Sequence, residues 1–166
     1  MPINLSIIAE LKHEAAITRK ALQRIPANMF GWQPHPKSMS LLRLASHLTD
    51  IHQWPIIMIT EKEFDFLKGG FKQGVYDSTE ALLQGFDDTL LATIQMLGDA
   101  DDDVLGQTWT LRRGEHVIFS IPRKQALRSM FMNHIIHHRG QLTVYLRLLD
   151  VPVPSIYGPS ADEQVF

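Results

Sequence analysis

The sequence predicts an all-α protein, a four-helix bundle with a small β-hairpin before the last helix. Three observations predict this fold. Apolar residues recur at helical spacing through four long segments. Stretches rich in proline and glycine separate those segments. A short segment before the last one alternates weakly around Gly114, as hairpins do. We expect residues 1–166 to form one domain, because this length can bury a core without disulfides.

Prolines and apolar spacing delimit the first two predicted helices. Residues 4–25 carry apolar side chains three and four positions apart, and a proline ends the pattern. Ser38 or Ser40 can cap a second helix, which we expect to continue to about residue 66. Pro55 lies inside this pattern, so we expect a kink or a loosened turn there.

The second half of the chain predicts a loop and two more helices. Residues 67–76 contain three glycines and should form a loop. Asp77 and Glu80 resemble a capping box for a third helix, which runs to about Leu97 before the acidic segment GDADDD stops it. The predicted hairpin comes next. The fourth helix should span residues 122–149, because a proline suits its first turn.

Composition narrows the range of partners. The net charge is −2 and the isoelectric point is near 6.4, so no overall positive field attracts nucleic acid. The absence of cysteine excludes disulfides, thiolate zinc sites and cysteine nucleophiles, and it agrees with a reducing compartment. No apolar run approaches the roughly 18 residues of a membrane span, and the N-terminus lacks the pattern of a signal peptide. We therefore expect a cytoplasmic protein with neither nucleic acid nor membrane as partner.

Histidine is the one unusual residue type, with eight copies, three of them in the segment NHIIHHRGQL. His134 and His138 are four residues apart and project from the same face of a helix, whereas His137 is turned away. This spacing lets two imidazoles bind one metal ion from a single helix. Two imidazoles without partners in an apolar core would cost on the order of several kcal/mol, and a metal ion would remove that cost.

A mononuclear site usually needs a third protein ligand. The best candidate is His47, on an apolar stripe of the predicted second helix; a hydrogen-bonded core histidine is the alternative reading. His52 is the competitor, because it follows Leu48 by four residues. The other histidines are expected on the surface or in loops, namely His13, His35 and His116.

Three segments, ASHLTDIHQW, NHIIHHRGQLTVYLR and VPVPSIYGPSADE, closely resemble the DinB/YfiT-like family of proposed metalloenzymes, which is distinct from the DNA polymerase of that name. The resemblance covers nearly the whole chain. It implies a four-helix bundle that pairs as a homodimer and binds a divalent ion through three histidines, which correspond to His47, His134 and His138. Relatives with known reactions include thiol-dependent transferases and isomerases, and many members have no assigned reaction. The resemblance thus allows a low-molecular-weight thiol such as mycothiol, bacillithiol or glutathione as a cofactor.

Two residues one helical turn beyond the candidate ligands could support the site. Gln141 follows His138 and could hydrogen-bond a ligand imidazole or a bound water. Asp50 follows His47 and could orient a ligand or act as a base; the alternative is a solvated helix residue. Imidazole ligands suit Zn, Ni, Fe, Co and Mn without distinguishing among them.

Three further residues near the site have a possible role. Arg139 could bind an anionic substrate or a neighbouring carboxylate. Gly140, in mid-helix, predicts the close approach of another helix. Tyr157 could cover one end of the site or anchor the tail to the core.

A divalent ion on three neutral imidazoles keeps open positions for water, substrate or thiolate. The ion can acidify a bound water or stabilise a thiolate. The sequence therefore favours a metal-dependent transferase or hydrolase that acts on a small molecule. The alternative is a non-catalytic metal-binding or stress-response protein in which the ion mainly stabilises the bundle.

Overall fold

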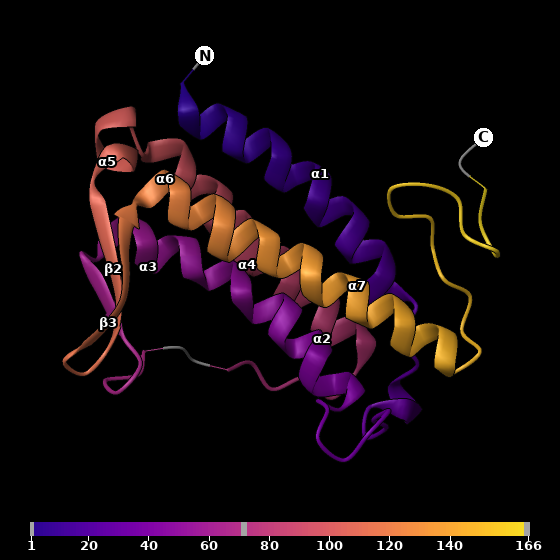
Figure 1. Cartoon of the computed structure of the whole chain (residues 1–166). Helices are drawn as coiled ribbons and strands as arrows, with labels where there is room; N and C mark the ends of the chain where they lie inside the picture. The colour runs from indigo at the N-terminus through magenta and orange to yellow at the C-terminus, as the bar shows by residue number, and fades with distance from the viewer. Residues whose placement is uncertain (1, 71–72, 165–166) are drawn as a thin grey trace.

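The computed structural model describes residues 2–70 and 73–164, and it shows a mostly helical chain with a small sheet at one end (Figure 1). Helices α1 and α2 each contact both α4 and α7, so their inner faces enclose one apolar core. The predicted helical class is confirmed, but the chain has more than four helices, and a third strand joins the predicted hairpin to make a three-stranded sheet. The four long helices are α1 (Ile3–Gln23), α2 (Leu41–Asp50), α4 (Thr79–Asp99) and α7 (Asn133–Leu148).

The predicted second helix is divided into α2, a 3-10 turn η2 (Ile51–Gln53) and α3 (Trp54–Thr60). Ser40 caps α2, because its hydroxyl accepts a hydrogen bond from the backbone N–H of Arg43. Pro55 lies in the first turn of α3, where a missing N–H costs little, and the predicted loosened turn is η2. The prediction that this helix reaches residue 66 is wrong.

Residues Glu63–Asp65 form strand β1 instead of helix. Strand β1 pairs in parallel with β2 (Thr108–Arg113), which pairs antiparallel with β3 (His116–Pro122). The predicted hairpin is confirmed, with Gly114 at φ 60° in its turn. Asp65 ties this turn to β1, because its Oδ1 accepts a hydrogen bond from the Gly114 N–H at 2.8 Å.

Short side chains cap the elements of the middle of the chain. Ser78, and not the predicted Asp77, caps α4: its hydroxyl accepts a hydrogen bond from the Ala81 N–H. The acidic segment stops α4 as expected, but Asp101 then caps an unpredicted helix α5 (Asp102–Gly106). The predicted loop at 67–76 has neither helix nor strand in its described residues; residues 71 and 72 of that prediction lie outside them.

The predicted last helix is helical throughout most of its length, but its middle is wider than an α-helix. Helix α6 (Arg123–Ala126) leads into a π-helical stretch η3 (Leu127–Met132), which ends directly before α7. Stretches of π-helix within α-helices are frequent at functional sites. No described helix is both long and apolar enough to cross a membrane.

Candidate metal centre

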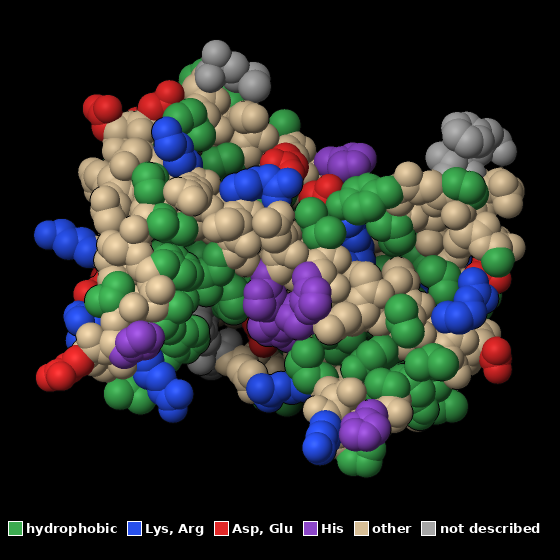
Figure 2. All heavy atoms as spheres, in the orientation of Figure 1, with side chains coloured by type: hydrophobic (Ala, Val, Ile, Leu, Met, Phe, Trp, Pro, Cys, Tyr) green, Lys and Arg blue, Asp and Glu red, His purple; other side chains and the backbone are tan. Residues whose placement is uncertain are grey.

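His47 on α2 and His134 and His138 on α7 lie together where these two helices meet. The Nε2 atom of His134 is 3.0 Å from that of His47 and 2.8 Å from that of His138. All three potential ligand nitrogens lie within 4.8 Å of one another. Figure 2 shows histidine side chains gathered at the middle of one face of the molecule, so solvent reaches the group.

The environment keeps these imidazoles neutral. Burial first, and the positive charge of neighbouring histidines second, lower the pKa of His47 and of His134 to about 4; Arg43 adds to the lowering at His47. Burial also lowers the pKa of His138. Metal binding requires the lone pair of neutral imidazole, so at neutral pH no proton has to be displaced from a charged ring.

The three Nε2 atoms cannot all be satisfied by protons. In the tautomer where His138 Nδ1 carries its proton, its Nε2 presents a lone pair to His134. His134 Nε2 then carries one proton or one lone pair, while it faces two nitrogen atoms. A cation between the rings would satisfy all three lone pairs. Ligand nitrogens of tetrahedral zinc, each 2.0–2.1 Å from the ion, lie about 3.3 Å apart, so small ring movements would admit it.

Gln141 supports this arrangement from one turn along α7. Its Oε1 lies 2.7 Å from His138 Nδ1 and accepts a hydrogen bond from it. That bond fixes the proton on Nδ1 and directs the Nε2 lone pair toward the other histidines. The sequence placed Gln141 near the ligands, and the structure gives it a hydrogen bond to one of them.

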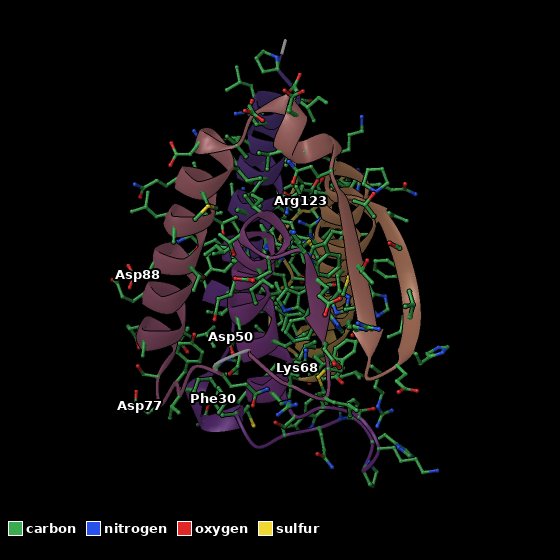
Figure 3. All side chains as sticks on the ribbon, turned by 90° about the vertical axis from the view of Figure 1, so that its left-hand side faces the viewer. Phe30, Asp50, Lys68, Asp77, Asp88 and Arg123 are labelled. Carbon is green, nitrogen blue, oxygen red and sulfur yellow. The ribbon has the colours of Figure 1, made fainter. Side chains whose placement is uncertain are left out.

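Asp50 lies beside the loop that leads from β1 to α4 (Figure 3). Its Oδ1 accepts a hydrogen bond from the Tyr76 hydroxyl at 2.9 Å, and its Oδ2 accepts one from the Gly74 N–H at 3.1 Å. Tyr76 passes so close to α4 that a Cβ on Gly85 would lie 2.5 Å from its ring. Asp50 therefore holds this loop to α2. No local sequence pattern predicts this contact.

Comparison with known proteins agrees with the geometry. A sequence profile of the DinB family matches residues 1–164. The chain belongs to the DinB family. No curated protein matches it.

Solved structures of DinB-like proteins share the fold of this DinB-family chain. One from Bacillus cereus ATCC 10987 is 24% identical, with a TM-score of 0.71, and the match covers 91% of this chain and 95% of that one. One from Bacillus subtilis is 20% identical, with a TM-score of 0.68 and coverage of 87% and 92%. A DinB-family structure from Exiguobacterium sibiricum is 19% identical, with a TM-score of 0.62 and coverage of 89% and 92%.

The other histidines of this DinB-family chain lie outside the group. His137 is exposed, as its register on the helix predicted, and so are the three histidines expected on the surface or in loops, His13, His35 and His116. His52, the competitor of His47, is fully buried and packs between Phe86 and Phe131. Its Nδ1 lies 3.3 Å from the Thr49 carbonyl oxygen. His52 is therefore a core residue.

Arg139, next to His138, faces away from the metal centre of this DinB-family protein. It is 1% exposed and its Nη1 lies 2.7 Å from Glu14 Oε2 on α1. This confirms the alternative in which Arg139 binds a neighbouring carboxylate instead of an anionic substrate. Tyr157 closes this cluster: its hydroxyl donates to Glu14 and accepts from Arg139. The expected close approach at Gly140 is wrong, because an added Cβ would meet nothing within 4 Å.

Trp54 is a further neighbour of the metal centre, and it was not among the residues predicted for the site. Its ring centroid lies 4.9 Å from that of His134 and 6.0 Å from that of His47. The signal was present, because Trp54 follows His47 by seven residues, two helical turns along the same face.

Proposed function

We propose that this DinB-family protein is a metal-dependent enzyme in which His47, His134 and His138 hold one divalent ion. The single observation that supports this most is the convergence of three low-pKa imidazoles from two helices. When bound, such an ion would polarise a small-molecule substrate or acidify a water or thiol for a transfer or hydrolysis reaction. A low-molecular-weight thiol as co-substrate is part of the proposal.

A catalytic role is favoured over a structural one by the number of ligands. Structural zinc sites are usually closed by four protein ligands, whereas catalytic sites have three and keep an open position. Within the described residues, the group that could hold an ion contains three side chains. His47 and His134 are also partly exposed, so a small molecule could reach the ion.

The chain's own residues would prepare the site. Gln141 keeps the Nδ1 proton of His138 in place, so the imidazole stays in the ligating tautomer. Trp54 covers the rings of His134 and His47 on one side and limits access of water there. Asp50, with a hydrogen bond at each oxygen, holds the loop near the site, and we assign it this role in place of a general base.

Metal analysis followed by a reaction screen would test the proposal. Protein purified without a nickel resin is incubated separately with Zn, Ni, Co, Mn and Fe(II), and its metal content is measured. We expect up to about one ion per chain. The loaded protein is then assayed with glutathione, mycothiol or bacillithiol and electrophiles, and with hydrolase substrates. A protein that binds none of these metals would refute the site. Metal binding that raises the melting temperature without any turnover would favour the structural role.

A further inference from the structure

A polar groove runs along α2, between this helix and the loop that Asp50 holds to it. One part of the groove has a volume of about 210 Å³ and is lined by Ser40, Leu42, Arg43, Ser46, Gln73 and Gly74. The adjoining part, of about 410 Å³, shares Gln73 and Gly74 and continues to Asp50 and Tyr76. Because roughly 15 Å³ of such space already accommodates one water, the groove has room for a small molecule.

Arg43 brings a positive charge to this groove, one helical turn before the metal ligand His47. Residues four apart project from the same face of a helix, about 6 Å apart along its axis. Burial and His138 lower the pKa of His47 most, and the positive charge of Arg43 adds to the lowering, so the guanidinium lies near this imidazole. Figure 2 shows a basic side chain next to the histidine group on the same face of the molecule. One small molecule can therefore reach both the metal centre and Arg43.

Arg43 lacks the carboxylate partner that most described arginines have. Arg19, Arg139 and Arg147, for example, each pair with an aspartate or a glutamate. Within residues 2–70 and 73–164, Arg43 forms no such ion pair; it is exposed and donates a hydrogen bond at 3.3 Å to the neutral Oε1 of Gln73. A positive charge beside a site for a divalent cation is unfavourable unless an anion offsets it. This end of the groove therefore favours a negatively charged group.

We propose that the groove binds a carboxylate of the molecule that reacts at the metal centre, and that Arg43 holds this carboxylate. A guanidinium presents paired N–H donors whose spacing matches the two carboxylate oxygens. The carboxylate would replace Gln73 Oε1 as acceptor, and Ser46 adds a hydroxyl donor to the lining. The proposal rests on the proposed function for the other end of the molecule. The carboxylate can belong to the thiol or to the second substrate.

Thiols with and without a free carboxylate test the assignment. Co(II)-loaded protein is titrated with 3-mercaptopropionate, 4-mercaptobutyrate and 6-mercaptohexanoate, each beside its methyl ester, and the thiolate-to-cobalt absorption reports binding. At least one acid should bind roughly tenfold more tightly than its ester, the factor expected for one charge-assisted hydrogen bond. In Arg43→Gln this preference should fall by at least about fivefold.

Hydroxamic acids, which bind divalent ions without a thiol, show which molecule carries the carboxylate. The monohydroxamates of succinic and glutaric acid are compared with their methyl esters by calorimetry on Zn-loaded protein. A preference that depends on Arg43 only among the thiols assigns the carboxylate to the thiol, and one only among the hydroxamates assigns it to the second substrate. A preference in both series means that the groove accepts either. No preference for the acid in either series would overturn the proposal, as would a preference that Arg43→Gln leaves unchanged.

Arg113→Gln is the matched control, because Arg113 is also exposed and has no carboxylate partner among the described residues, but lies on strand β2. The preference for the acid should persist in this variant. An equal loss in both variants would reveal a general effect of net charge and would overturn the proposal. Because Arg43 is exposed, Arg43→Gln should fold, and an unchanged melting temperature checks this.

Metal-free protein distinguishes failure of this proposal from failure of the proposed function. In ¹⁵N-labelled protein without metal, the Nε–H resonance of Arg43, assigned with Arg43→Gln, should shift with 4-mercaptobutyrate and not with its methyl ester. If the protein takes up no cobalt, this resonance decides. A shift then supports the carboxylate site and counts against the metal centre alone, whereas no shift overturns both.

Discussion

Gln141 Oε1 lies 2.7 Å from His138 Nδ1, one turn along the same helix. This single hydrogen bond determines which nitrogen of His138 carries the proton. With the proton on Nδ1, the Nε2 lone pair faces His134 at 2.8 Å. Gln141 therefore prepares the ligand atom without approaching the ion itself.

Replacing Gln141 should weaken metal binding without removing it. In Gln141→Leu, His138 loses the acceptor that fixes its tautomer, and we expect the affinity for Zn to fall roughly 10- to 100-fold. Competition against a chromophoric chelator measures this. Gln125→Leu is a control, because Gln125 is exposed on α6. An unchanged affinity in Gln141→Leu would show that the hydrogen bond does not tune the site.

The three neighbouring histidines of α7 should differ sharply. His134→Ala, His138→Ala and His47→Ala should each abolish tight binding, because each removes one of three ligand nitrogens. His137→Ala is the matched control: this side chain is exposed, so the stoichiometry should stay at about one ion per chain. The measurement is metal content per chain under one protocol. Loss of the ion in His137→Ala with retention in His138→Ala would refute the site.

Removing the ion should lower thermal stability. A ligand that binds only the native state adds about 2.7 kcal/mol when its concentration is a hundredfold above Kd. For a domain of this size, that corresponds to a fall in melting temperature of roughly 5–10 °C after chelation. Calorimetry with and without EDTA measures the difference. His47→Ala should show no such shift, and an equal shift in that variant would mean that EDTA acts elsewhere.

The metal-free protein should lose stability as pH falls from about 6.5 to about 4. Burial lowers the pKa of His52, His47 and His134 to about 4, so the unfolded chain binds more protons in this window. The free energy of unfolding therefore decreases as pH falls, by up to about 3 kcal/mol for fully buried His52 alone. Urea titrations across this pH window, in the wild type and in His52→Leu, measure the contribution of His52 to the pH dependence of the free energy of unfolding. Equal pH slopes in both proteins would contradict it.

We also predict a two-fold homodimer, which the family resemblance and a surplus of apolar residues on the middle helices suggested. The structure narrows that apolar set: Met58 is 1% exposed and cannot contribute, whereas Leu91 on α4 is 66% exposed. Light scattering at micromolar concentration should report about twice the chain mass, and Leu91→Asp should shift it toward the monomer. A wild-type monomer would rule the dimer out.

Local sequence determined those features that depend on neighbours along one helix. Apolar spacing located α1 to within a few residues, and a capping signal with an acidic stop did the same for α4. Ser40, which caps α2, was one of the two serines expected there. The four-residue spacing of His134 and His138 placed both on one face and turned His137 outward. These outcomes follow from the 100° step per residue, which operates whatever the rest of the chain does.

Tertiary structure decided everything that depends on distant contacts. Residues 63–65 read as the end of a helix, but pairing with β2 makes them a strand. No local signal predicts the hydrogen bond between Asp50 and Tyr76, and none predicts that the buried N–H of Trp109 has no partner among the described residues. His47 and His52 could be ranked from sequence, yet only the packing of α2 against α7 brought His47 to His134, 87 residues away, and enclosed His52 between aromatic rings. Periodicity fixes the face on which a side chain projects, whereas the partner that meets that face is set by how whole elements pack.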